Sequence, residues 1–209
     1  MEDVLDVYER QYDRRKPVVC MDEKPTQLLG DGRPSVPAKI GSGIKKKDYE
    51  YERNGTANVF SAVEPLAGRH FTKVTDRRRK PDFAEFLKDV ADSYKKVKKV
   101  VLVMDNLNTH NETSLIERYG PEKGRKIWNR FEVHYTPKHA SWLNQAEIAI
   151  GIYSRQCLGK DRIATMEELK CKSNAWNKCA NKEELKINWT FTKKKAQKKF
   201  KYKQNRRAK

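Results

Sequence analysis

Two short apolar runs along the chain each end at an aspartate. Residues 18–21 are followed by Asp22, and residues 100–104 are followed by Asp105. Valine-rich runs of this length are typical of strands buried on both faces. A carboxylate directly after such a strand lies at its carboxyl end, where ligands bind in open α/β sheets. If the two strands are neighbours in one sheet, we expect both acids to lie at one point.

The remaining apolar pattern predicts further strands and several helices. Stretches of strand length occur at residues 58–63, 69–75 and 131–135, and the first two are spaced as a hairpin. The helical spacing of apolar positions predicts helices at residues 82–94, 112–130 with a break at Gly120, 142–157 and 166–180. We therefore expect the α/β class, with a mixed five-stranded sheet flanked by helices.

Polar segments flank and interrupt this pattern. Residues 1–16 are interpreted as a short charged lead with weak apolar anchors, and the first strand is expected to end at a turn around Pro25. Residues 30–55 hold no clear period, so we expect a long loop there. Asp82 and Glu85 have the spacing of a capping box and are expected to start the helix after Pro81.

Basic residues dominate the composition. Lys and Arg number 46 against 28 Asp and Glu, which gives a net charge of +18 in 209 residues. Such an excess indicates a polyanionic partner, most commonly nucleic acid. Residues 193–209 carry ten Lys or Arg and no acid. We therefore divide the chain into one domain, residues 1–192, and a polybasic tail, residues 193–209, that we expect to become helical on DNA.

The composition also favours the cytoplasm. The first residues are acidic where a secretory leader would be basic, and no apolar run approaches the ~20 residues of a membrane span. The four cysteines lack metal-type spacing and are interpreted as reduced thiols: Cys20, Cys157, Cys171 and Cys179. We expect no membrane partner and, given the basic charge, a cytoplasmic, nucleoid-associated protein.

A third acid, Glu147, lies on the predicted helix 142–157, which can dock it over Asp22 and Asp105. Three carboxylates around one point suit hard cations such as Mg²⁺ or Mn²⁺, and two such ions support phosphoryl transfer. Taken singly, each aspartate could cap a turn, and Glu147 could be an exposed helix residue. The three acids together, in a basic chain, favour a site for two metal ions.

Six segments of the chain form a recognisable set: VVCMDE (18–23), DYEYERNGTANVF (48–60), EPLAGRHFTKVTDRR (64–78), VLVMDNLNTH (101–110), HYTPKHASWLNQAE (134–147) and SRQCLGKDRI (154–163). They cover nearly the whole chain, and the last three are highly distinctive together. These segments resemble those of bacterial insertion-sequence DDE transposases, in the mariner-like superfamily and insertion-sequence family 630.

The resemblance implies a ribonuclease-H-like fold and a catalytic triad that matches Asp22, Asp105 and Glu147 by motif. The family reaction is Mg²⁺-dependent hydrolysis at transposon ends, followed by attack of the freed 3′-hydroxyl on target DNA. The implied partners are double-stranded DNA, at transposon ends and target, and a second copy of the chain in the DNA complex. Members carry a helix-turn-helix region before the first catalytic strand. This chain starts just before that strand, so we expect the region to be absent and end recognition to reside in a separate domain.

Other residues of these segments have candidate roles. Asn106 and His110 follow the second acid and Asn144 precedes the third, so all three are candidates to support the triad, although the first two could merely build a turn. Glu23 is not counted among the candidate metal ligands, because adjacent strand residues point to opposite faces and Asp22 is the candidate. Basic side chains suited to DNA phosphates, each with a solvated loop or tail as the alternative, are Lys138, His139, Arg155, Arg162, Lys193, Lys194 and Lys195.

Three other functions remain open from the sequence. A truncated transposase could persist as a non-catalytic DNA-binding remnant, and another nuclease could use the same ribonuclease-H-like fold. A basic RNA-binding protein would explain the charge but would leave the acids after the buried strands unexplained. An aspartyl phosphatase is disfavoured, because it needs a second aspartate two residues after Asp22, where Lys24 stands.

Overall fold

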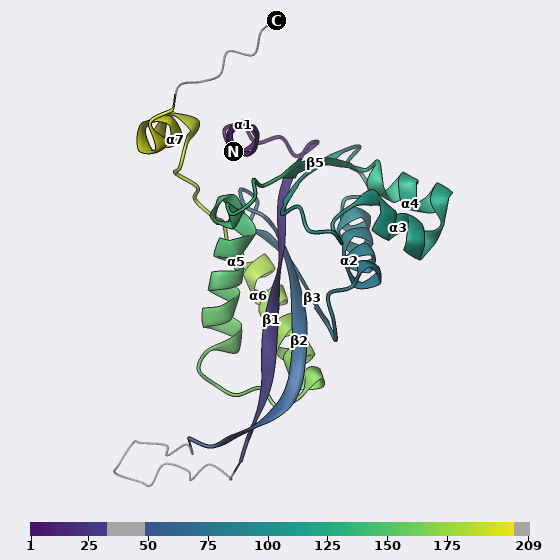
Figure 1. Cartoon of the computed structure of the whole chain (residues 1–209), viewed down its shortest axis with the longest axis vertical. Coiled ribbons are helices and arrows are strands. Elements are labelled where there is room, and N and C mark those ends of the chain that lie inside the picture. The colour runs from purple at the N-terminus through teal and green to yellow at the C-terminus, as the bar shows by residue number, and fades with distance from the viewer. Residues whose placement is uncertain (33–48, 203–209) are drawn as a thin grey trace, which may run out of the picture.

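The structure, a computed structural model, describes residues 1–32 and 49–202. Its helices and strands are drawn in Figure 1. In chain order they are α1 (Glu2–Tyr8), β1 (Val18–Asp31), β2 (Tyr51–Glu64), β3 (Arg69–Thr75), α2 (Lys80–Ser93), β4 (Val100–Met104), α3 (Glu112–Tyr119), α4 (Pro121–Trp128), β5 (Phe131–Tyr135), the short 3₁₀ turn η1 (Ser141–Leu143), α5 (Gln145–Tyr153), the π-helical turn η2 (Ser154–Leu158), α6 (Met166–Lys182) and α7 (Lys193–Phe200).

The strands form one five-stranded sheet in the order β3-β2-β1-β4-β5. The first three strands pair antiparallel, whereas β1 with β4 and β4 with β5 pair parallel. This confirms the predicted mixed sheet. It also confirms that the two valine-rich runs are neighbours, because Val18 pairs with Val101 and Cys20 pairs with Val103.

The strand β1 does not end at Asp22, which corrects the prediction of a strand end and a turn there. Its pairing with β4 stops at Cys20, but its pairing with β2 continues to Asp31 opposite Tyr51. The two strands form an arm that extends beyond the rest of the sheet (Figure 1). Along the arm β1 is an edge strand, where a proline such as Pro25 is tolerated. Much of the predicted loop 30–55 lies in residues 33–48, outside the described residues.

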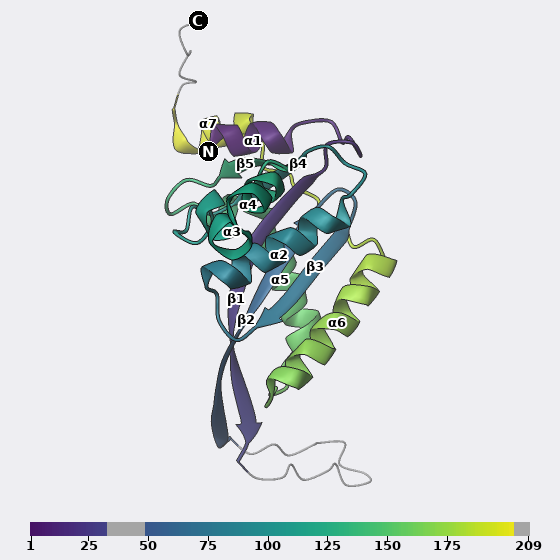
Figure 2. The ribbon, with the colours of Figure 1, turned by 90° about the vertical axis from the view of Figure 1, so that its right-hand side faces the viewer.

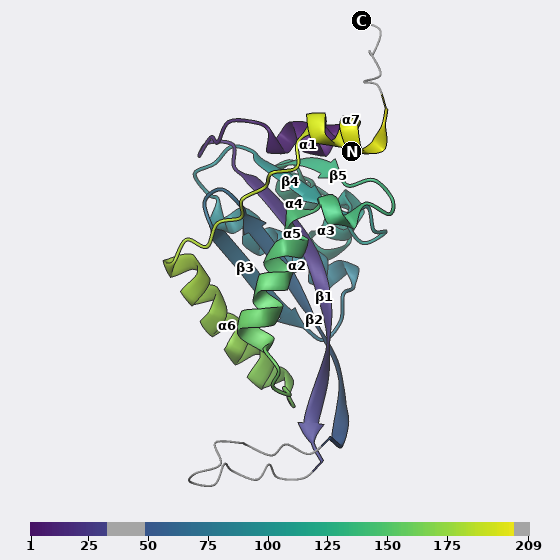
Figure 3. The ribbon, with the colours of Figure 1, turned by 90° about the vertical axis from the view of Figure 1, so that its left-hand side faces the viewer.

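Helices cover both faces of the sheet. On one face α2 and α3 pack over β1, β2 and β4, in a core that includes Met21, Phe60, Phe83 and Leu102 (Figure 2). On the other face lie α5 and α6, the latter against β3 (Figure 3). Side chains alternate between the two cores along β1, because successive strand residues point to opposite faces. This two-sided burial explains the continuous apolar run before Asp22.

Both ends of the described chain pack on the domain. At the N-terminus this differs from the prediction of a charged lead with only weak apolar anchors. Residues 2–8 form the helix α1, whose apolar side chains are buried because they face the sheet and α7: Val4, Leu5 and Val7. The helix α7 is formed without DNA and buries Ala196 against this region. It is tied to α1 by an ion pair between Lys193 and Asp6. Residues 203–209 of the tail lie outside the described residues.

The start of α2 differs from the prediction, whereas the break between α3 and α4 agrees with it. The N-cap of α2 is Arg79, whose backbone N–H donates to Asp82 at 2.9 Å, so the predicted capping box at Asp82 and Glu85 was misplaced by three residues. The break at Gly120 is confirmed, and its positive φ of 82° explains why a glycine lies between α3 and α4. Among the described residues, none of the helices is both long enough and apolar enough to cross a membrane.

Candidate active site

The parallel register of β1 and β4 places two acids side by side. Cys20 pairs with Val103, and Asp22 and Asp105 each lie two residues further along, so both carboxylates leave the sheet on the same face. This is the face covered by α5, because Cys20 and Val103 contact its alanines. Asp105 is the first residue after β4, whereas Asp22 lies within β1 at the point where the β4 pairing ends.

Asn144 fixes the start of α5 over Asp22. Its side chain is fully buried, and its Oδ1 accepts the backbone N–H of Ala146 as an N-cap. Its Nδ2 donates to the carbonyl of Met21 at 2.8 Å and to Oδ2 of Asp22 at 3.2 Å. One amide therefore joins a helix terminus to the acid-bearing strand. Glu147 lies in the first turn of the same helix, with an exposed side chain.

The electrostatics confirm that the three acids are close. Burial raises the pKa of the Asp22 carboxyl to about 7. The negative charges of Glu147 and Asp105 add to this rise in the pKa of Asp22, whereas a hydrogen bond from the N–H of Glu23 opposes it. A buried carboxylate among like charges is destabilised until something positive joins it. The structure thus places Glu147 and Asp105 close enough to Asp22 for their charges to act on its carboxyl.

His110 connects Asp105 to a fourth acid on the other side of the sheet. Its Nε2 lies 2.7 Å from Oε1 of Glu23, and its Nδ1 lies 2.6 Å from Oδ1 of Asp105. The imidazole is fully buried and stacks on Phe83, with 4.7 Å between ring centroids. Burial alone would lower the pKa of His110, but the hydrogen bonds to the two carboxylates outweigh it and raise that pKa to about 9. An imidazolium therefore bridges the two acids.

Glu23 was wrongly treated in the sequence analysis as unconnected to the acids. It does point to the face opposite Asp22, as strand alternation requires, but its side chain is 2% exposed and contacts His110. The available signal was the histidine five residues after Asp105, since a buried glutamate requires a cation or donor nearby. Asn106, the other predicted supporting residue of that segment, is exposed.

The predicted DNA-binding residues lie in different surroundings. Lys138 and His139 are exposed in the turn before α5, and Arg155 is exposed at the end of that helix. Arg162 binds Asp31 at 2.9 Å and backbone carbonyls at the far end of the arm, so its guanidinium already has acceptors within the chain. In the tail, the Nζ of Lys193 is paired and that of Lys195 donates to a backbone carbonyl, whereas Lys194 is exposed.

The donor set of the acid cluster is made of oxygen atoms, as hard divalent cations prefer. Within residues 1–32 and 49–202, however, no three His, Cys, Asp or Glu side chains are close enough to hold one metal ion. The residues therefore fit a divalent cation in the chemistry of their donor atoms, although their side chains are not arranged around a single point.

Residues 17–170 match the family model described as DDE superfamily endonuclease. The chain belongs to this family. The match includes all three acids of the cluster as well as Glu23, His110 and Asn144. No curated protein is significantly similar to the chain.

Solved structures with the same fold are complexes of a mariner transposase. The chain is similar to the Mos1 mariner paired end complex with Mn, with a TM-score of 0.55 and 15% identity over 88% of this chain and 54% of that chain. For the Mos1 Strand Transfer Complex the TM-score is 0.55 and the identity 13%, over 88% of this chain and 55% of that one. The chain thus spans about half the length of these proteins. The likeness establishes the ribonuclease-H-like fold that the sequence resemblance implied.

Proposed function

We propose that this chain is the catalytic domain of a mariner-like transposase that cleaves and joins DNA strands. The observation that carries the proposal is the group of Asp22, Asp105 and Glu147, placed near one another by the β1–β4 register and by Asn144, with their charges raising the pKa of Asp22. Family membership and the fold support the same chemistry. In detail we assign the chain to the bacterial insertion-sequence family 630 and to the cytoplasm, associated with the nucleoid.

The three acids would hold two Mg²⁺ or Mn²⁺ ions. When bound, such ions supply a nucleophilic water or hydroxyl and stabilise the leaving oxygen in phosphoryl transfer. The residues of the chain provide the framework for this chemistry. Asn144 positions the carboxylate of Asp22 by donating to its Oδ2, and His110 positions that of Asp105 through the 2.6 Å contact of its Nδ1 with Oδ1.

Double-stranded DNA is the proposed substrate and partner. The paired-end and strand-transfer complexes of Mos1 contain transposon DNA by their description, which supports the same partner here. Lys138, His139 and Arg155 are exposed on either side of α5 and are suited to phosphates beside the acids. We further propose that the chain acts as a dimer in its DNA complex and that a separate domain recognises the transposon ends.

A second candidate function is a DNA-binding remnant without catalysis. It is favoured by one observation, that within the described residues the acids do not approach closely enough to hold one metal ion. The two functions differ in what happens when a divalent cation is supplied. A catalytic domain draws the three carboxylates onto the ion, whereas a remnant leaves them apart.

Anomalous diffraction from crystals soaked in Mn²⁺ tests the proposal. For the wild-type chain we expect metal peaks between the carboxylates of Asp22, Asp105 and Glu147, and for Asp105→Ala we expect those peaks to vanish while the fold is kept. Exposed acids elsewhere, such as Asp89 on α2, serve as an internal control for surface binding. A wild-type crystal with no metal among the three acids would support the remnant instead.

Metal affinity should depend on pH through Asp22. In the metal-free folded chain the pKa of this carboxyl is about 7. Below that pH a metal ion must displace the proton of Asp22 in order to bind, whereas above that pH the carboxyl is already ionised. Mn²⁺ affinity is therefore expected to fall about 15-fold between pH 7 and pH 5.5 for one displaced proton, because half of the Asp22 carboxyls are already protonated at pH 7. Calorimetric titrations in buffers of different ionisation enthalpy measure that proton. An affinity independent of pH over this range would show that the metal does not bind at Asp22.

DNA binding through α7 should appear in its salt dependence. Deleting the helix would remove the buried Ala196 and the ion pair of Lys193, so charge substitution is the cleaner test. Lys194→Gln combined with Lys198→Gln alters two exposed ammonium groups and is expected to lower the log–log salt slope by about 1.8. The matched control, Lys95→Gln with Lys96→Gln, removes the same charge between α2 and β4. Equal slopes for the two variants would rule out a specific role of α7.

A further inference from the structure

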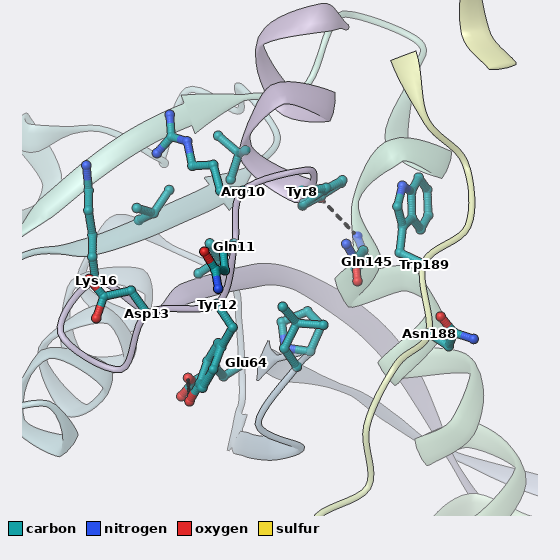
Figure 4. Close-up of a pocket in the computed structure, with 15 residues that line it drawn as sticks. Tyr8, Arg10, Gln11, Tyr12, Asp13, Lys16, Glu64, Gln145, Asn188 and Trp189 are labelled. Atoms are coloured by element: carbon teal, nitrogen blue, oxygen red, sulfur yellow. Dashed lines mark hydrogen bonds between the residues drawn. The ribbon is translucent and has the colours of Figure 1, made fainter. Parts of the chain in front are cut away.

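A cavity of about 160 Å³ lies apart from the acid cluster, at the opposite side of the start of α5. Its wall is built by α1 and the segment after it, the turn between β2 and β3, the first residue of α5 and the extended segment before α7 (Figure 4). None of the three acids lines it. A cavity of this size holds a single six-membered ring with a small substituent, since ~150 Å³ suffices for benzene.

One part of the cavity wall is apolar and rich in rings. Branched or cyclic side chains come from β1, β4 and the β2–β3 turn, and rings come from α1 and the segments around it. These residues are Val18, Val101, Pro65, Tyr8, Tyr12 and Trp189. Tyr8 and Trp189 meet edge to face, with ring centroids 5.3 Å apart, so their positions are fixed by each other. The shape therefore selects a planar ligand.

One buried acceptor in the wall has no donor. Gln145 is 4% exposed, and its Oε1 is buried without a hydrogen-bond partner. Its backbone N–H donates to the hydroxyl of Tyr8, which holds the residue in place beside the cavity (Figure 4). A buried carbonyl left without a donor costs about 1–3 kcal/mol. A ligand that donates an N–H to this oxygen would recover that free energy.

A buried carboxylate in the wall adds further acceptor capacity. Glu64 is 4% exposed and accepts from the hydroxyl of Tyr12 at 3.0 Å and from that of Tyr94 at 2.7 Å. Two hydroxyl donors leave unused lone pairs on a carboxylate, which has about four acceptor positions. Arg10 and Lys16 also line the cavity, and both are paired with Glu132, which lies outside the lining.

We propose that this cavity is a binding site for a small aromatic cation or amine, a planar ring that carries N–H donors. The apolar wall accommodates the ring, and the unpaired oxygen of Gln145 with the carboxylate of Glu64 receives the donors. Both of these groups are acceptors, so they favour a donor over an anion of the same shape. The site is independent of the proposed DNA chemistry, so either assignment stands without the other.

Benzamidine and benzoate test the ligand chemistry directly. The two molecules have the same size and shape, but the amidinium only donates hydrogen bonds and the carboxylate only accepts them. For the wild-type chain we expect benzamidine to bind with a Kd on the order of 1 mM and at least tenfold more tightly than benzoate. The indole N–H signal of Trp189 in heteronuclear NMR spectra provides a local readout. Equal binding of the two probes, or tighter binding of benzoate, would overturn the proposal.

Two variants separate the cavity from non-specific binding. Gln145→Leu removes the unpaired acceptor and keeps the backbone bond to Tyr8, so we expect a folded chain whose benzamidine affinity falls at least tenfold. Gln27→Leu makes the same change at an exposed position of the arm and should leave the affinity unchanged. If Gln145→Leu fails to fold, Asn188→Trp at the exposed rim blocks the mouth and must abolish binding. Undiminished affinity in the folded variant would refute the site.

Discussion

Replacing Asp22 with asparagine should reduce Mn²⁺-dependent nicking of supercoiled plasmid DNA at least about 1,000-fold, equivalent to about 4 kcal/mol of activation free energy. The amide keeps the shape of the side chain but loses the charge that binds a divalent cation. Asp22 is the acid most deeply placed in the cluster, and its carboxylate is oriented by Asn144. The rate of conversion of supercoiled to open-circular plasmid measures the effect.

Loss of folding does not account for that result. Because burial and neighbouring acids raise the pKa of Asp22 to about 7, the ionised carboxylate destabilises the metal-free fold above that pH. The asparagine variant is therefore expected to unfold at the same temperature as the wild type or at a higher one. Asp92→Asn, at an exposed ion pair with Lys88 on α2, makes the same change in charge and should retain wild-type nicking. Nicking by Asp22→Asn within tenfold of the wild type would contradict the assignment.

The sequence predicted best those elements that are buried on both faces or along one helical stripe. The strands at residues 69–75, 100–104 and 131–135 have the predicted bounds, because their apolar pattern comes directly from the core that covers them. The long arm of β1 and β2 was underestimated. Beyond Cys20 the arm lacks the β4 partner and most of its helix cover, so its residues carry no continuous apolar signal.

The three acids of the candidate site could be predicted from the sequence, but the hydrogen bonds and ion pairs that link them to other residues could not. The apolar runs led to Asp22 and Asp105, the predicted helix led to Glu147, and the family resemblance matched the same three acids by motif, but none of these signals carried the contacts that join them. What joins them depends on contacts between segments far apart in the chain, such as the bond from Asn144 to Asp22. The prediction separated Glu23 from the three acids only because neighbouring strand residues point to opposite faces. It did not foresee that His110, which follows β4, contacts both Glu23 and Asp105. The local sequence pattern identifies which face of the sheet a strand residue points to. Whether a side chain reaches past the end of a strand can be seen only in the folded structure.

His110 is the residue whose loss should most reduce stability. Replacing it with glutamine leaves Glu23, 2% exposed, without a cation, and breaking a buried ion pair from one side costs about 3–5 kcal/mol. Urea denaturation at pH 6 measures this loss. In the double variant with Glu23→Gln both charges are gone, so we expect a substantial part of the stability to return. A double variant no more stable than His110→Gln would show that the pair is not coupled.

The pH dependence of stability identifies the charge on His110 as the cause. The folded pKa of about 9 lies above the unfolded value, so the folded chain binds the proton more tightly than the unfolded chain. The stability that this proton contributes is fully present below about pH 6.5 and is lost as the pH rises through about 9. The free energy of unfolding of the wild type minus that of His110→Gln should therefore shrink between pH 6 and pH 9.5. A difference that stays constant would mean that the imidazole acts by packing on Phe83 and not by its charge.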